Sequence, residues 1–225
     1  TLLSAPLLWE YAHAAGYQTA YWTSQHPMFA NTRMLLQGAP IDRCVWAPTL
    51  DPLADYLVGA ADELVSERAL ADLATMREPF FAVAHFSNVH MPRRVKRERA
   101  PFQPSDERYR RSGDERQRNY YRNAVYLSET AVAKLIAGLR ASAVGARTVV
   151  LYVSDHGEAW FEHEQANDHG STLFDEEIRI NAWLDAPPNT LSPTERRHLE
   201  AASTRQLFQI DVAPTVLDLL GVYDS

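Results

Sequence analysis

The sequence predicts a layered α/β fold, in which helices lie on both faces of a largely parallel sheet and so form three layers. Two observations predict it: a helical pattern is followed directly by a strand pattern three times along the chain, and two of these strands are continuous apolar runs of the kind buried on both faces. With 225 residues, of which 46% are hydrophobic and 23% charged, the chain can bury one substantial core. We therefore expect a single domain over residues 1–225.

The first helix and strand are predicted at the start of the chain. Ser4 can cap a helix over residues 2–16, because apolar side chains then recur at helical spacing until Gly16 ends the pattern. The β-rich run QTAYWT predicts a strand over residues 18–23 directly afterwards. A helix followed at once by a strand is the first half of an α/β repeat.

The same order recurs twice. A helical pattern over 61–76 precedes the apolar strand PFFAVAHF (79–86), and a long amphipathic helix over 118–142 precedes the apolar strand RTVVLYVS (147–154). The remaining patterns predict a strand over 177–184, a polar helix from Thr194 and a final helix over 211–220.

Charge argues against a general nucleic-acid binder. The net charge is −7, whereas phosphate contacts need clustered Lys and Arg whose charge is not cancelled locally. One basic cluster runs from Arg93 to Arg122, mostly within the long polar connection 87–117, and acidic residues are interleaved with it. It is either a solvated segment of mixed charge or a rim that attracts an anionic substrate.

Cys44 is the only cysteine, so neither an intrachain disulfide nor a thiolate metal cluster can form. No run approaches the roughly 20 apolar residues that span a bilayer, and the N-terminus lacks a signal-peptide pattern. The chain starts at Thr1, within a predicted helix, and we interpret it as a fragment of a longer protein.

A carboxylate and an imidazole follow the strand that ends at Ser154. Adjacent side chains on a regular strand point to opposite faces, so Asp155 and His156 can converge on one ion only if the chain turns between them, and Gly157 allows such a turn. Oxygen and nitrogen donors suit zinc or manganese, while calcium prefers oxygen throughout. In the alternative interpretation, Asp155 caps a following helix and His156 makes a hydrogen bond in a loop.

A second strand end supplies His90, in the segment NVHMP. Ligands of open α/β sheets gather at the carboxyl ends of the strands, so His90 can bind an anionic substrate or protonate a leaving group. A purely structural histidine is the alternative. We expect His85, inside the same strand, to pack or to make a buried hydrogen bond.

Two more histidines follow the predicted metal ligands. His163 lies in Glu162-His163-Glu164 and His169 in Asp168-His169-Gly170; one can face the site while the other lies in solvent. No GxxxxGK[ST] loop and no GxSxG nucleophile elbow is present, which removes the usual support for nucleotide-dependent and serine-hydrolase chemistry.

Five blocks in order carry a family resemblance over nearly the whole chain. They are LLWEYAHAAGYQTAYWTSQ, PFFAVAHFSNVHMP, VVLYVSDHGE, DHGSTLFDEEIRI and DVAPTVLDLLGV. The chain resembles the sulfatase-like hydrolases and transferases of the alkaline phosphatase superfamily, including phosphoethanolamine transferases. The resemblance implies an alkaline phosphatase-like fold whose N-terminal part lies outside this chain.

The resemblance also implies roles for individual residues. Asp155 and His156 become metal ligands, with zinc or manganese as the expected ion and calcium as an alternative. His90 and His169 become catalytic and substrate-binding residues that contact the transferred sulfate or phosphate. His163 becomes a substrate-binding candidate, although Glu164 stands where sulfatases commonly have Gly.

The resemblance places the nucleophile, a Ser, Thr or modified Cys, upstream of the first helix. Cys44 follows that helix and lacks the Cys-x-Pro-x-Arg surroundings, and Thr1 and Ser4 are poor substitutes. We therefore expect residues 1–225 to hold half of the metal site and to need the missing segment for turnover.

The implied function is metal-dependent hydrolysis or transfer of a sulfate or phosphate ester, with a small anionic ester or a lipid headgroup as substrate. Sulfatases usually place a Lys in the loop after SDHG, whereas no Lys follows Lys134 in this chain, which favours histidine-assisted transfer of the phosphoryl type, as in phosphoethanolamine transferases, over sulfate transfer. The alternative is a catalytically inactive binding or regulatory domain. The resemblance further suggests a bacterial protein in the periplasm or another extracytoplasmic location, tethered to the inner membrane through an N-terminal region; the oligomeric state stays open.

Overall fold

The chain folds into α/β structure around a parallel sheet, which confirms the predicted fold class. The computed structural model describes residues 5–108, 115–163, 167–170 and 172–223. These residues form two compact units: the first combines residues up to 101 with 121–142 and the chain from 210 onwards, and the second combines 102–120 with 143–209. Each unit is described by itself.

The first unit contains most of the helices. Its elements are α1 (Leu8–Ala14), β1 (Gln18–Thr23), η1 (Phe29–Asn31), α2 (Thr32–Leu35), β2 (Arg43–Val45), α3 (Ala47–Leu50), α4 (Asp62–Leu73), β3 (Phe80–His85), η2 (Arg97–Arg99), the larger part of α5 (Glu115–Ala141) and α8 (Val212–Leu219).

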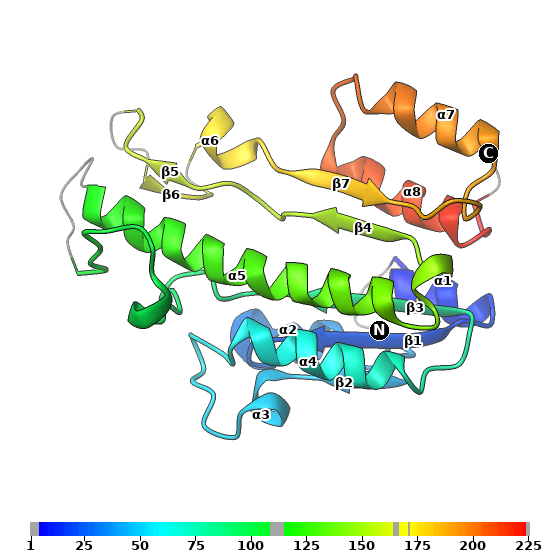
Figure 1. Cartoon of the computed structure of the whole chain (residues 1–225), viewed down its shortest axis with the longest axis horizontal. Helices are drawn as coiled ribbons and strands as arrows, with labels where there is room; N and C mark the ends of the chain where they lie inside the picture. The colour runs from blue at the N-terminus through cyan, green and yellow to red at the C-terminus, as the bar shows by residue number, and fades with distance from the viewer. Residues whose placement is uncertain (1–4, 109–114, 164–166, 171, 224–225) are drawn as a thin grey trace. The chain divides into compact units, whose positions relative to one another are not determined.

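A parallel sheet in the order β2-β1-β3 forms the centre of the first unit (Figure 1). Ala20 of β1 lies opposite Arg43 of β2 and Ala82 of β3. Because β1 is the middle strand, five of its six residues are buried. β3 was predicted to be buried on both faces, but all of its residues are half-buried, since it is an outer strand of this three-stranded sheet.

Successive side chains of β1 meet helices on opposite faces of the sheet. Tyr21 packs edge-on against Trp9 of α1, with ring centroids 5.5 Å apart. The next residue, Trp22, donates its indole N–H to Asp72 Oδ2 of α4 at 2.7 Å. Because side chains alternate along a strand, α1 and α4 cover different faces, as the predicted layering requires.

The second unit is built on antiparallel pairs. Its elements are η3 (Gly145–Arg147), β4 (Val150–Val153), β5 (Ala159–Trp160), β6 (Asn167–Asp168), α6 (Asp175–Ile178), β7 (Ala182–Asp185), α7 (Pro193–Ala202) and the start of η4 (Gln209–Asp211). β4 pairs with β7, where Tyr152 stacks on Trp183 at 5.1 Å, and β5 pairs with β6.

The helix predicted over residues 2–16 is shorter in the structure, because α1 covers only Leu8–Ala14, and its predicted cap Ser4 lies outside the described residues. Two further predictions of local structure need correction. The strand predicted over 177–184 is wrong in its first half: the chain makes the helical turn α6, and the strand is β7 at 182–185. Acidic residues at 175–177 favour a first helical turn, which explains the difference. β4 was predicted to be buried on both faces and is half-buried along its length.

Buried polar side chains fix the chain where β1 and β3 end. Ser24 donates its hydroxyl to Asp62 Oδ1 at 2.6 Å, and the Ser87 N–H donates to the same oxygen at 3.1 Å. Asn88 accepts the Asp62 N–H at 2.9 Å and donates to Ala60 O at 2.7 Å. The segment that leads from β3 to His90 is therefore anchored to the first turn of α4.

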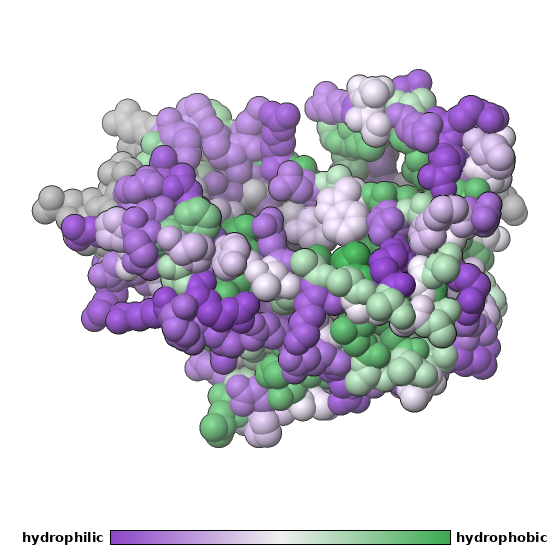
Figure 2. Space-filling model, in the orientation of Figure 1, coloured by the Kyte–Doolittle hydropathy of each residue, from purple (hydrophilic) through white to green (hydrophobic). Residues whose placement is uncertain are grey.

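Apolar residues reach the surface of the first unit near α3 (Figure 2), where Leu53 is 91% exposed and Leu57 is half-exposed. Within the described ranges, no helix combines the length and the apolar character needed to cross a bilayer.

Asp62 gives a test of this anchoring. Burial raises the pKa of the Asp62 carboxyl above its usual range, and hydrogen bonds from Ser24, Ser128 and the Ser87 N–H lower it by less. Because the folded pKa exceeds the unfolded value of about 3.9, its contribution to stability is present at low pH and is lost as pH rises through the folded pKa. Each unit of difference corresponds to about 1.4 kcal/mol.

We expect Asp62→Asn to remove the pH-dependent contribution of Asp62 to stability, because the amide oxygen can still accept from Ser24 while no charge is buried. Urea unfolding between pH 4 and pH 8 should show the variant gaining stability relative to wild type as pH rises. Asp218→Asn, at an exposed position of α8, is the control. If the free energy of unfolding changed with pH in the same way in wild type and Asp62→Asn, the raised pKa of Asp62 would be contradicted.

Candidate metal and histidine site

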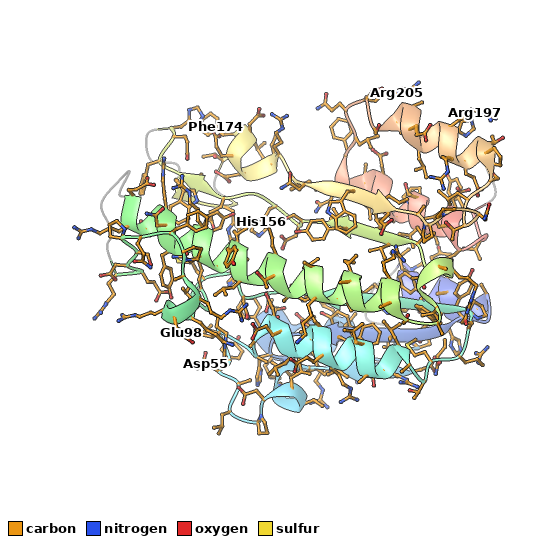
Figure 3. All side chains as sticks on the ribbon, viewed as in Figure 1. Asp55, Glu98, His156, Phe174, Arg197 and Arg205 are labelled. Atoms are coloured by element: carbon orange, nitrogen blue, oxygen red, sulfur yellow. The ribbon has the colours of Figure 1, made fainter. Side chains whose placement is uncertain are left out.

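Asp155 and His156 lie just after β4, from which Ser154 separates them, in the second unit (His156 is labelled in Figure 3). The Asp155 side chain is 79% exposed and that of His156 is 38% exposed. The His156 imidazole lies against a carbonyl, with Nδ1 2.8 Å from Gly157 O. A carbonyl can only accept, so Nδ1 carries the ring proton of the neutral imidazole and Nε2 carries the lone pair.

That lone pair lies beside the neighbouring carboxylate. His156 Nε2 is 3.6 Å from Asp155 Oδ2. Two ligand atoms bound at about 2.1 Å to one tetrahedral zinc ion are about 3.4 Å apart, so this donor set fits a shared ion. The Nδ1 contact agrees with the common arrangement in which a metal-binding histidine donates its other N–H to a carbonyl.

The alternative in which Asp155 caps a helix is wrong. The next element after Asp155 is β5, and Asp155 Oδ1 accepts the N–H of His156 at 2.9 Å. The side chain of Gln209 donates to the Asp155 carbonyl oxygen at 2.6 Å, which holds the backbone of this turn. The loop hydrogen bond expected for His156 in that alternative is present, and it leaves Nε2 available to bind an ion.

Gly157 makes this turn possible, but through space and not through an unusual φ. Its N–H donates to Glu177 O at 2.7 Å. A Cβ added at position 157 would lie 2.1 Å from Glu176 O, far inside van der Waals contact. Only glycine allows the chain to approach α6 this closely.

His169 lies beside His156. Their rings stack with centroids 3.8 Å apart and planes inclined by 26°. Glu158, whose side chain is 11% exposed, places Oε1 3.6 Å from His169 Nδ1. The structure therefore brings together three of the predicted site residues, Asp155, His156 and His169, and adds the carboxylate of Glu158.

His163 has a different environment. Its ring stacks on Phe174 at 3.8 Å, at the start of α6 (Phe174 is labelled in Figure 3), and Nε2 lies 3.5 Å from Glu176 Oε1. We expected one of His163 and His169 to face the site and the other to lie in solvent; the His163 side chain is 46% exposed but packs on Phe174. Glu164, the departure from the family pattern, lies outside the described residues.

His90 belongs to the first unit. Its N–H donates to Ser87 O at 3.0 Å, and its ring contacts Phe29 edge-on at 4.9 Å. Its predicted role as a catalytic and substrate-binding residue stays a prediction. His85 confirms its expected structural role: Nδ1 is 2.9 Å from Thr23 Oγ1 and the ring stacks on Tyr21.

The basic cluster is largely engaged with neighbouring groups. Lys96 and Arg99 both form ion pairs with Glu63, and Arg118 pairs with Glu162 at 3.2 Å. The Arg93 guanidinium lies 5.1 Å from the centre of the Tyr121 ring. These contacts favour the interpretation as a segment of mixed charge.

Cys44 is a poor candidate for the nucleophile. Desolvation raises the pKa of its thiol, which disfavours the reactive thiolate. It lines a surface hollow of about 440 Å³ with residues such as Arg33 and Trp46, and none of the predicted site residues lines that hollow.

Among the residues that the structure describes, no three His, Cys, Asp or Glu side chains are arranged to hold one ion. Asp155 and His156 would therefore supply only part of a coordination shell, since a zinc site needs about four ligands. Sequence reasoning gave no role to Glu176 and Glu177, although both stand in the DEEIRI block; their contacts emerge only from the folded chain.

A family model described as Sulfatase matches residues 3–222. Among solved structures, the chain is similar to the C-terminal periplasmic domain of EcEptC from Escherichia coli in complex with Zn, with a TM-score of 0.70, 20% identity and coverage of 97% of this chain and 62% of that one. It is also similar to the lipoteichoic acid synthase LtaP from Listeria monocytogenes, with a TM-score of 0.67, 18% identity and coverage of 96% and 53%.

A third similar structure is a protein in the alkaline phosphatase superfamily from Vibrio parahaemolyticus, with a TM-score of 0.63, 20% identity and coverage of 96% of this chain and 47% of that one. The chain thus spans about half the length of the solved structures that it matches. These likenesses show an alkaline phosphatase-like fold. No curated protein sequence matches the chain.

We expect Gly157→Ala to destabilise the second unit by about 1–3 kcal/mol, because the added methyl group meets the Glu176 carbonyl and the turn must move. Chemical unfolding measures the loss, and the histidine ring resonances report whether His156 leaves its stacked position. A variant with wild-type stability and unchanged resonances would contradict the close packing of this turn.

Proposed function

This chain belongs to the sulfatase family, and from that membership we propose that it supplies metal-binding and histidine groups for hydrolysis or transfer of a sulfate or phosphate ester. The observation that carries the proposal is the arrangement of His156. Its Nδ1 is engaged by the Gly157 carbonyl, and its Nε2 lies 3.6 Å from the Asp155 carboxylate. Two electron-rich atoms this close favour a cation between them.

Asp155 and His156 would hold the ion, with zinc or manganese favoured by the mixed oxygen and nitrogen donors and calcium as an alternative. When bound, such an ion polarises the ester oxygens and lowers the pKa of the attacking group. His169, which stacks on His156, would bind an oxygen of the tetrahedral anion or hold a proton near the leaving group. We propose the same two roles for His90 and a substrate-binding role for His163.

A phosphoethanolamine-type phosphate ester is the substrate class we favour, with sulfate esters as the second. The part of the chain after Lys134 contains no Lys, so histidines and arginines are the available cationic groups near the predicted site. The Zn complex of the periplasmic EcEptC domain supports a metal-dependent reaction and an extracytoplasmic location. A structure of BT4656 in complex with its substrate D-glucosamine-2-N,6-O-disulfate, which is 13% identical at a TM-score of 0.67, supports sulfate esters as the second substrate class.

Metal binding tests the first half of the proposal. We expect the chain to bind Zn²⁺ or Mn²⁺ in isothermal titration, and Asp155→Ala or His156→Ala to weaken binding at least tenfold, since even loss of a residue that supports a ligand costs roughly 10–100-fold. His198→Ala, at an exposed histidine of α7, is the matched control and should bind like wild type. Equal affinity in all four proteins would refute the site.

Turnover tests the second half. Aryl phosphate and aryl sulfate esters should be cleaved in a metal-dependent reaction by a protein that combines this chain with a nucleophile-bearing segment, and His169→Ala or His90→Ala should lower kcat by about 10²–10⁴-fold. Residues 1–225 alone are expected to show no turnover, because no Ser, Thr or Cys in them stands in the family's nucleophile pattern.

Two outcomes would count against this half. Metal-dependent turnover by residues 1–225 alone would overturn the need for an external nucleophile. Metal and ester binding without turnover in the combined protein would favour the alternative, a catalytically inactive binding domain.

A further inference from the structure

α6 carries a buried carboxylate to which the proposed function gives no role. Glu177 is 3% exposed. Its Oε2 accepts the N–H of Gly170 at 3.0 Å and the N–H of Thr172 at 3.3 Å, and its Oε1 accepts the Thr172 hydroxyl. A carboxylate has acceptor sites for all three donors, and hydrogen bonds to a charged group are about twice as strong as neutral ones.

The backbone of Glu177 is hydrogen-bonded to the turn that carries His156. The Glu177 carbonyl accepts the N–H of Gly157 at 2.7 Å. The preceding carbonyl, of Glu176, lies where a side chain at position 157 would have to be. Glu177 thus binds two segments at once, one through its carbonyl oxygen and one through its carboxylate.

Each segment places a histidine next to its anchor. His156 directly precedes Gly157, and His169 directly precedes Gly170. The two rings lie 3.8 Å apart in a stacked arrangement. The separation between the two imidazoles therefore depends on a short path that runs from Gly157 through Glu177 to Gly170.

We propose that Glu177 is a positioning residue that holds Gly170 and Thr172 against the turn 155–157, and so keeps His169 stacked on His156. The inference rests on the proposed function for its catalytic meaning, but its geometry can be tested without any turnover. In this role Glu177 acts through the two backbone segments that carry the histidines, to which its carboxylate and its carbonyl oxygen are hydrogen-bonded.

Two substitutions separate positioning from general stability. Glu177→Gln keeps the length of the side chain: its amide oxygen can accept both N–H groups, and its NH₂ can donate to the Thr172 hydroxyl. Glu177→Ala removes all three bonds. Asp72→Asn is the control, because Asp72 is another buried carboxylate, bonded to Trp22 in the first unit.

The experiment is amide hydrogen exchange, with the histidine ring resonances as a second readout, on the 225-residue chain without added metal. We expect Glu177→Ala to speed exchange of the Gly170 and Thr172 amides at least about tenfold and to remove the ring-current shifts that His156 and His169 impose on each other. Glu177→Gln should stay within about threefold of wild type, and Asp72→Asn should leave both amides unchanged.

Three results would overturn the inference: unchanged exchange at Gly170 and Thr172 in Glu177→Ala, an equal rise in exchange over the whole chain, or a Gln variant that behaves like the Ala variant. Failure of the proposed function is distinguishable, because wild type would then bind neither Zn²⁺ nor Mn²⁺ even though Glu177→Ala released the two amides. If wild type bound metal while both amides stayed protected in Glu177→Ala, the positioning role would fail and the metal site would stand.

Discussion

The contact between His156 Nδ1 and the Gly157 carbonyl is the interaction on which the rest of the site depends. It assigns the ring proton to Nδ1 and turns the Nε2 lone pair towards the carboxylate of Asp155. With the proton on the other nitrogen, the same side chain would present a donor to that position and could not bind a cation there. The chemical character of the site is thus set by a backbone carbonyl and not by a side chain.

That carbonyl lies where it does because position 157 has no side chain. The close approach of Gly157 to α6 ties the turn after β4 to a short helical turn that also carries Glu177. Gly157, Gly170 and Thr172 are then hydrogen-bonded to the same residue of this helical turn. Preorganisation of this kind lowers the cost of gathering a charged constellation, since the groups lose little freedom when a ligand arrives.

In the first unit, too, a small set of hydrogen bonds fixes the chain where strands end. Ser24, Asp62 and Asn88 form a buried hydrogen-bonded cluster that fixes the start of the segment towards His90. Polar groups buried in this way are costly unless each finds a partner, so such a cluster specifies one conformation of the segment. The match to the sulfatase family covers residues 3–222 and therefore includes both units.

The sequence by itself determined the fold class, the family and most of the elements. Helix–strand alternation and apolar runs are local properties, so β1, α4, β3 and α8 could be read from composition and spacing. The strand β2, only three residues long, and the turn α6 could not, because neither carries a periodic signal. The sequence blocks likewise predict Asp155, His156 and His169 as site residues, and the structure brings their side chains together.

Only the tertiary structure decided how those residues are used. The proton position on His156 depends on the orientation of the Gly157 carbonyl, which the packing of Gly157 against α6 fixes. The stacking of His169, the environment of His163 against Phe174 and the burial of Glu177 depend on contacts between residues that are not neighbours in the sequence. The local sequence pattern cannot predict such contacts, because packing between distant parts of the chain decides which groups approach one another. The sequence specifies which chemical groups are present, and the tertiary structure determines which groups contact one another.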